Sequence, residues 1–303
     1  MASFRELHFA QRLGVARAWC RKMRLFITGG NGFIGSEVCR QAKEAGHDLY
    51  VLQRPHRLDS IPWQAISEFQ PEVAIHCAWI ATPGVYLDSP ENVVLKDQSI
   101  SLFQGLADAG LRHFVGCGTC AEYAPSVSAL EEDKSAIAPL SIYAKAKHGL
   151  HCDLRKAASK SSTTLTWARI FFPYGPSEHP DRLVSSLFRA FQAGGRERLR
   201  SPSAVRDYIH VHDVASGLLA CALSHADGCC NIGTGEGVSL DRLESEVARL
   251  CGRTDLAVET IRTERERTAD CFVASTRKLR ELGWRPRFKL SEGLTDYQCS
   301  ISA

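Results

Sequence analysis

Short apolar runs alternate with segments of helical periodicity in the first half of the chain. The first apolar run covers Met23–Ile27, and a glycine-rich turn separates it from a predicted helix over Ser36–Ala45. Later runs cover Asp48–Leu52, Glu72–Ala78 and His113–Gly118. Strands that alternate with helices are typical of a parallel sheet covered by helices on both faces. The pattern therefore predicts an α/β fold with a doubly wound parallel sheet.

The connection between two of these predicted strands is short. Only about 20 residues separate Leu52 from Glu72, and a βα unit with a further strand needs most of that length by itself. We therefore expect an intervening strand and helix that are both shortened. The chain shows no internal repeat and no low-complexity tract.

The composition is that of an ordinary globular protein. The chain has 303 residues, of which 44% are hydrophobic and 23% are charged, enough for a full core and a smaller second lobe. The net charge of +3 gives no argument for a nucleic-acid partner. No apolar run approaches the roughly 20 residues of a membrane span. We expect neither a nucleic acid nor a membrane as partner.

The cysteines favour a reducing compartment. The chain has 12 of them, spread through predicted strands and helices instead of short loops, which suits buried free thiols. We therefore expect a cytoplasmic protein. Cys117 and Cys120 have the spacing of a redox or metal pair, but no second Cys/His pair accompanies them, and we expect no metal site.

Residues 1–22 precede the first predicted strand and are rich in arginine. They carry five basic residues against the single acid Glu6. Such a stretch can be a transit peptide. The only two methionines are Met1 and Met23, and Met23 stands directly before the first strand. We expect residues 1–22 to be an extension that is disordered or not native, with Met23 as an alternative start.

The glycine-rich turn carries the first chemical signal. Gly29, Gly32 and Gly35 lie between a predicted strand and a predicted helix. This spacing lets the backbone approach a pyrophosphate and directs the N–H groups of the helix N-terminus at the anion. The turn therefore predicts a dinucleotide site, and the alternative is a glycine-rich turn without a ligand.

A second signal lies further along the chain. Tyr143 and Lys147 are four positions apart, so they share one face of a helix. An ammonium close to a phenol favours its ionised form. Thr119 ends a predicted strand, where a hydroxyl can hydrogen-bond a substrate oxygen. The alternatives are a surface pair on the helix and a threonine that satisfies a strand-end amide.

In this order and spacing, these features resemble the extended short-chain dehydrogenase/reductase family, in its nucleotide-sugar epimerase/dehydratase branch. The resemblance extends from Met23 to the C-terminus. Further matching segments are Thr119–Tyr123, Arg169–Pro176, Arg206–Ala215, Asn231–Gly235, Leu282–Pro286 and Glu292–Leu294. The resemblance implies a Rossmann-type NAD(P)-binding domain over residues 23–172, to which a segment of about 206–235 returns. A smaller substrate-binding lobe would comprise residues 173–205 and 236–303.

The resemblance also implies roles for individual residues. Tyr143 would be the acid/base, Lys147 would hold the coenzyme ribose and lower the tyrosine pKa, and Thr119 would orient the reacting oxygen. Arg206 matches an arginine that contacts the substrate diphosphate, which suits a guanidinium. The implied coenzyme contacts are Gly29, Asn31, Gly32, Phe33, Ile34, Gly35, Arg54, Cys77, Ala78, Tyr143 and Lys147. The implied substrate contacts are Thr119, Cys120, Phe172 and Arg206.

Departures from the family pattern bear on the reaction. The 4,6-dehydratases carry their eliminating acid at the positions of Cys120 and Ala121, whereas Glu122 lies one position too late. Dehydration is therefore disfavoured. The 3,5-epimerase/reductases carry a catalytic cysteine at the position of Ala121, not of Cys120, so double epimerisation is disfavoured too.

The end of the second strand bears on the coenzyme. An NAD enzyme usually has an acid here for the ribose 2′-hydroxyl. Here no acid lies between Leu52 and Asp59, while Arg54 and Arg57 could pair with a 2′-phosphate. The sequence thus favours NADP(H) and leaves NAD(H) possible, since both arginines can also be solvated loop residues.

NADPH favours net reduction. We expect reduction of a 4-keto-(6-deoxy) nucleotide sugar to the 4-hydroxy sugar, with Tyr143 as proton donor. Phe172 replaces an asparagine that many members use to contact the substrate. The alternatives are an NAD-dependent nucleotide-sugar 4-epimerase, a reductase of a non-sugar carbonyl and a non-catalytic cofactor sensor. Members often form homodimers through a four-helix bundle, here from about Val93–Ala109 and Tyr143–Ser159.

Overall fold

A six-stranded parallel sheet forms the centre of the structure, a computed structural model that describes residues 21–197, 199, 201–256 and 271–302. Its strand order is β2-β1-β3-β4-β5-β9, and every neighbouring pair is parallel. The strands are β1 (Arg24–Thr28), β2 (Asp48–Leu52), β3 (Val73–His76), β4 (His113–Thr119), β5 (Thr164–Ile170) and β9 (Gly228–Ile232). The parallel α/β sheet predicted from the apolar runs is confirmed.

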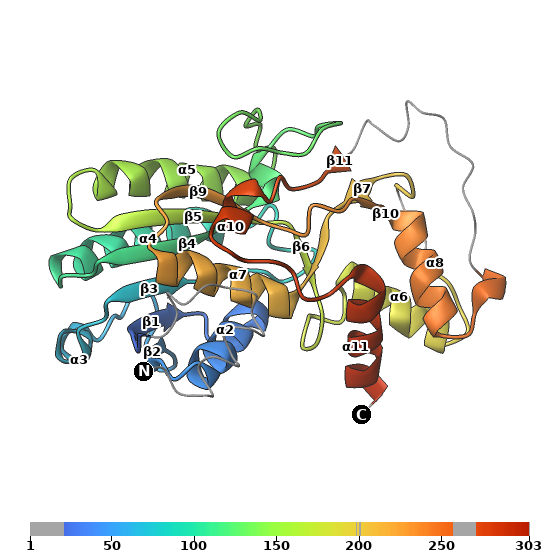
Figure 1. The fold of residues 1–303 in the computed structure, drawn as a ribbon, viewed down its shortest axis with the longest axis horizontal. Helices are drawn as coiled ribbons and strands as arrows, with labels where there is room; N and C mark the ends of the chain where they lie inside the picture. The colour runs from blue at the N-terminus through green and yellow to red at the C-terminus, as the bar shows by residue number, and fades with distance from the viewer. Residues whose placement is uncertain (1–20, 198, 200, 257–270, 303) are drawn as a thin grey trace.

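Helices cover both faces of this sheet (Figure 1). On one face α2 (Phe33–Glu44) packs against α7 (Val211–Ser224), and on the other α4 (Glu91–Asp108) packs against α5 (Ile142–Ala158). Each pair closes its own apolar core against the sheet. In β1, Leu25 and Ile27 belong to the first core, while Phe26 belongs to the second. Central strands that are buried on both faces need such continuous apolar runs.

The connection between β2 and β3 differs from the prediction. It contains the single short helix α3 (Trp63–Phe69), and the described residues 53–72 form no strand. The expected intervening strand was therefore wrong. A parallel crossover already consumes at least 10 to 12 residues, so the segment is long enough for one crossover but not for two. As a result β2 is the outer strand next to β1.

Most of the remaining elements build a smaller lobe beside the sheet, whereas α10 packs against β9 of the large sheet and against α7 (Figure 1). It contains a three-stranded sheet in the order β10-β7-β11 and a two-stranded sheet of β6 and β8. A third apolar core joins β6, β8 and β10 to α6, α8 and α11. The bounds are β6 (Phe172–Tyr174), α6 (Leu183–Gln192), β7 (Val205–Arg206), β8 (Tyr208–His210), β10 (Val238–Ser239), α8 (Leu240–Leu250), η3 (Thr254–Leu256), β11 (Cys271–Phe272), α10 (Arg277–Glu281) and α11 (Leu290–Ser302).

Two expectations on the chain's organisation remain. The domain boundaries at residues 172, 206 and 235 stay predictions, although β9 does join the large sheet. Residues 1–20 of the predicted extension over residues 1–22 lie outside the described residues. Within the described ranges, the structure contains no helix that is long and apolar enough to cross a membrane.

Candidate active site

Two adjoining cavities lie at the carboxyl ends of the central strands. The first has a volume of about 360 Å³ and is lined by the ends of β1, β3 and β4, by α5 and by residues of the smaller lobe. The second, of about 530 Å³, extends from the glycine turn to the end of β2. Gly29, Gly32, Trp79 and Ile80 line both. A crevice at the carboxyl ends of the strands is where open α/β sheets bind ligands.

The structure brings the residues predicted from the sequence together around these two cavities. The first cavity is lined by Gly29, Gly32, Phe33, Ile34, Gly35, Cys77, Thr119, Cys120, Tyr143, Lys147, Phe172 and Arg206. The second is lined by Asn31, Arg54, Arg57 and Ala78, besides the two shared glycines. All predicted contacts therefore lie in one continuous region, although their individual roles stay predictions.

The glycine turn forms a cradle that fits the pyrophosphate of a dinucleotide. A Cβ at Gly29, whose φ is +69°, would lie 2.7 Å from the backbone nitrogen of Ala78, and one at Gly35 would collide with the carbonyl of Gly29. Gly32 is the N-cap of α2 and supplies no side-chain cap. The first N–H groups of α2 are thus available to an anion, which a helix N-terminus stabilises.

Tyr143 and Thr119 form the reactive end of the first cavity. The two side chains are hydrogen-bonded, and burial raises the pKa of Tyr143 although the bond with Thr119 lowers it. Tyr86 packs edge-on against Tyr143 with ring centroids 5.0 Å apart. Tyr143 therefore keeps its proton at neutral pH, next to a second hydroxyl that can share a substrate oxygen.

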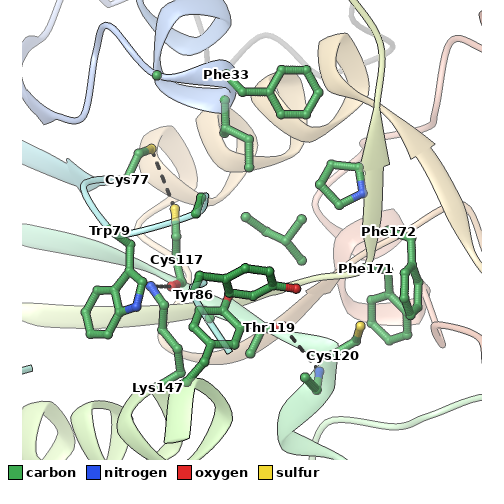
Figure 2. Close-up of a pocket in the computed structure, with 18 of the residues that line it drawn as sticks. Phe33, Cys77, Trp79, Tyr86, Cys117, Thr119, Cys120, Lys147, Phe171 and Phe172 are labelled. Carbon is green, nitrogen blue, oxygen red and sulfur yellow. Dashed lines mark hydrogen bonds between the residues drawn. The ribbon is translucent and has the colours of Figure 1, made fainter. Parts of the chain in front are cut away.

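Lys147 lies one helical turn beyond Tyr143 and is buried in the same cavity wall (Figure 2). Its Nζ donates to the carbonyl of Cys117 at 2.8 Å and lies 3.7 Å from the ring centroid of Trp79. Burial lowers the pKa of Lys147 to about 8. The lowered tyrosine pKa implied by the family resemblance is absent here, because the ammonium is directed at Cys117 and Trp79 and burial dominates at the phenol.

A buried ion pair supports Thr119 from behind. Glu122 accepts hydrogen bonds from the backbone nitrogen of Thr119 at 3.0 Å and from Arg169 Nε at 3.0 Å. Burial would raise the pKa of Glu122, but the contact with His148, whose Nδ1 lies 3.7 Å from Oε2, the charge of Arg169 and the hydrogen bonds from Thr119 and Trp167 lower it overall. Sequence analysis did not identify this pair. A charged residue inside the apolar run of β5 was the available signal, because a buried arginine needs a partner.

The opposite wall of the cavity carries Arg206 and aromatic rings. The guanidinium carbon of Arg206 lies 5.2 Å from the ring centroid of Phe172 and 5.3 Å from that of Phe272. Phe272 is opposite Arg206 in the β7–β11 ladder, which places the two side by side. Cys120 is buried in the same wall, and burial raises the pKa of its thiol. This wall therefore joins one cation to a mostly apolar surface.

Four aromatic residues of the site were missed from the sequence: Trp79, Tyr86, Phe171 and Phe272. Trp79 and Tyr86 follow the carboxyl end of β3, and Trp79 Nε1 is held by Asn92 Oδ1 at 2.7 Å. Aromatic residues in the loop after a central strand were a usable signal, because such loops carry binding residues in this fold class. Phe272 offered no local signal.

A known protein family matches most of the chain. The profile described as "NAD dependent epimerase/dehydratase family" matches residues 25–233. The chain belongs to this family. The resemblance to the extended short-chain dehydrogenase/reductases is thereby confirmed, and the protein is an enzyme of the NAD-dependent oxidoreductase type.

Individual relatives agree over most of their length. The UDP-glucose 4-epimerase of Rhizobium leguminosarum bv. trifolii is 26% identical over 88% of this chain and 94% of its own. The structure of the Thermus thermophilus UDP-glucose 4-epimerase in complex with NAD has a TM-score of 0.75 at 23% identity, over 93% of this chain and 99% of that one. MoeE5 in complex with UDP-glucose and NAD has a TM-score of 0.76 at 25% identity, over 92% and 98%.

The buried ammonium of Lys147 gives a test by pH. Its pKa is about 8 in the folded protein, against an ordinary value of 10.5. Between these two values the unfolded chain binds more protons at Lys147, so the free energy of unfolding should rise with pH. Without coenzyme, the free energy of unfolding of the wild-type protein should rise between these two pH values by on the order of 3 kcal/mol more than that of Lys147→Met. Urea unfolding at a series of pH values measures the difference.

Lys145→Met is the matched control, because Lys145 lies on the same helix with its side chain exposed. It should keep the pH dependence of wild type. Parallel curves for wild type and Lys147→Met would contradict the burial of a charged amine.

Proposed function

We propose that the protein is a nucleotide-sugar 4-epimerase that uses a nicotinamide coenzyme. The observation that carries this proposal is the hydrogen-bonded pair of Tyr143 and Thr119, in a cavity that continues into the glycine cradle. The choice of epimerisation draws on the similarity to UDP-glucose 4-epimerases over most of the chain.

The side chains divide the chemistry between them. The coenzyme, when bound, supplies the hydride acceptor and donor. Tyr143 would take the proton of the sugar 4-hydroxyl only in its ionised form, which the positive charge of an oxidised nicotinamide ring beside it would favour against burial. It would later return that proton, while Thr119 holds the same oxygen. The ammonium of Lys147 has a pKa of about 8, so it is close to losing its proton near neutral pH. Burial of all three groups keeps water away from the keto sugar.

The substrate's other groups face the smaller lobe. Arg206 supplies the cation for a diphosphate, which a guanidinium binds in a two-pronged manner. Phe172 and Phe272 offer the sugar an apolar wall with no hydrogen-bonding group of their own. Such a wall leaves a keto sugar free to present its other face to the coenzyme, as epimerisation requires.

A second candidate is NADPH-dependent reduction of a 4-keto-(6-deoxy) nucleotide sugar. Arg54 and Arg57 line the second cavity, at the end of β2 where the adenosine ribose of a dinucleotide would lie. No acid lies between Leu52 and Asp59. This charge pattern suits a 2′-phosphate, and a reductase consumes NADPH where an epimerase recycles its coenzyme.

The fate of the coenzyme separates the two candidates. With UDP-glucose and a trace of NAD, an epimerase should form UDP-galactose with no net change in absorbance at the nicotinamide band. Tyr143→Phe should lose at least a hundredfold in turnover but still bind coenzyme, because only the proton transfer is removed. Tyr50→Phe, on β2 and outside both cavities, should behave as wild type. Stoichiometric oxidation of NADPH by a 4-keto-6-deoxy sugar nucleotide would establish the reductase instead.

Arg54 gives the test of coenzyme choice. If the site takes NADPH, Arg54→Ala should weaken NADPH binding about 10- to 100-fold and leave NADH nearly unchanged, because it removes a charge-assisted hydrogen bond. Titration by nicotinamide fluorescence measures both affinities. Lys43→Ala removes an equal charge outside the cavities and is the control. Equal affinities of wild type for NADH and NADPH would favour NAD and the epimerase.

We also propose a homodimer formed through α4 and α5. These helices pack against each other on one face of the sheet. Val93, in the first turn of α4, and Leu140, two residues before α5, both expose large apolar side chains. An interface between two copies would bury these side chains. Val93→Glu with Leu140→Glu should shift the mass in light scattering from dimer to monomer. Val127→Glu, at an exposed valine elsewhere, should leave it unchanged. A monomeric wild type would refute the proposal.

A further inference from the structure

Two cysteines face each other at the floor of the first cavity. Their sulfurs, Cys77 Sγ and Cys117 Sγ, lie 3.6 Å apart (Figure 2). Both residues line the cavity next to the glycine turn and Lys147. The proposed function uses neither thiol. Cys117 is buried in the first apolar core, and Cys77 packs against that core and is partly exposed.

The sheet register holds these thiols together. The last paired residues of β3 and β4 are His76 and Gly116, so Cys77 and Cys117 are the next residues on two adjacent parallel strands. Neighbouring strands are about 4.7–4.9 Å apart. That separation falls within the range of about 4.4–6.8 Å between the Cα atoms of a disulfide. A bond between the two sulfurs therefore needs side-chain rotation and little movement of the backbone.

The surroundings favour a reactive thiol. The pKa of Cys117 is lowered because the neighbouring Cys77 thiol hydrogen-bonds with its sulfur, although burial opposes this and the Lys147 charge supports it. Lys147 Nζ is bonded to the carbonyl of Cys117 itself. A thiolate beside a cation and open to a cavity is the reactive form of cysteine.

We propose that Cys77 and Cys117 form a reactive dithiol in the coenzyme cavity, which hydroperoxides oxidise to a disulfide and which bound coenzyme shields. One thiolate attacks a peroxide oxygen, the O–O bond breaks, and a sulfenic acid forms. The second sulfur attacks that sulfenic sulfur, the S–S bond forms, and water leaves. In total two thiols and one hydrogen peroxide give one disulfide and two waters, so the peroxide accepts the two electrons that the sulfurs lose.

The disulfide would alter the coenzyme site at two points. A Cβ at Gly29 would lie 2.8 Å from the carbonyl carbon of Cys77, which shows how tightly the glycine turn packs on that backbone. Cys117 carries the carbonyl that holds Lys147. Because the glycine turn and Lys147 contact this backbone directly, even the small adjustment that closes the bond acts on the pyrophosphate cradle and on the lysine together, and we expect oxidised protein to bind coenzyme at least several-fold more weakly.

A second thiol pair in the same protein provides an internal control. The side chains of Cys221 and Cys230 are also hydrogen-bonded to each other, but both are buried in the core between α7 and β9 and line neither cavity. In folded protein this pair should stay reduced, because hydroperoxides cannot reach it.

The test uses fully reduced wild-type protein and hydrogen peroxide, followed by alkylation of free thiols and peptide mass analysis. We expect the loss of two hydrogens, a peptide linking Cys77 to Cys117, and reversal by dithiothreitol. NAD or NADP at about ten times its Kd should slow the reaction about tenfold, because only the coenzyme-free fraction reacts. Cys77→Ser should form no link and should leave Cys117 trapped by dimedone as a sulfenic acid. Cys299→Ser, at an exposed cysteine, should react as wild type.

The proposal fails if the linked peptide is absent, if Cys221 and Cys230 are linked first, or if coenzyme does not slow the reaction. Because these measurements follow mass and linkage without any sugar substrate, they are independent of the proposed reaction. An inactive enzyme that still forms the shielded link would refute the epimerase and leave the dithiol in place.

Discussion

The buried ion pair between Glu122 and Arg169 is the contact on which the geometry of the site depends. It joins the end of β4 to β5, and Arg169 continues through the hydroxyl of Tyr123 to Asn231 on β9, with bonds of 2.9 Å each. Burying two charges is costly, and the cost is offset only where every partner is satisfied. Glu122 meets that condition, since Thr119, Trp167 and Arg169 all donate to it. The carboxyl ends of three strands are thus fixed together, and Thr119 with them.

Burial determines the pKa values of two titratable groups that line the first cavity, Tyr143 and Lys147. It raises the pKa of the phenol of Tyr143 and lowers that of the amine of Lys147, because the loss of water favours the neutral form of each group. The two pKa values therefore move apart, upward at the phenol and downward at the amine. In the coenzyme-free protein Tyr143 thus holds its proton firmly, and Lys147 is the group of the two that gives up a proton near neutral pH.

The same edge of the sheet serves binding, proton transfer and thiol chemistry because parallel strands end together. β1 contributes the glycine cradle, β3 contributes Cys77, and β4 contributes Cys117 and Thr119. The smaller lobe adds Arg206 and Phe272 from a separate sheet. Because adjacent strands are only about 5 Å apart, a structural change at the end of one strand displaces atoms at the ends of the neighbouring strands. This proximity couples the redox state of the dithiol to coenzyme binding in our proposal.

The sequence by itself determined what local patterns encode. The apolar run Asp48–Leu52 matches β2, and the turn from Gly29 to Gly35 leads into α2 as its glycine spacing required. The pair Tyr143 and Lys147 lies on one helix facing one cavity, since the helical period alone fixes their relation. Matches to the family pattern then indicated the fold and the enzyme class.

Only the tertiary structure decided how distant residues meet. Glu122 and Arg169 are 47 positions apart, and Cys77 and Cys117 are 40 apart, so neither pair leaves a periodic trace in the sequence. Three further features also leave no local pattern in the sequence. They are the absence of a strand from the described residues between β2 and β3, the contact of Lys147 with the ring of Trp79, and the pairing of Phe272 with Arg206. Their positions follow from strand order and register, which arise when the helices close both faces of the sheet, and not from the propensity of any single segment.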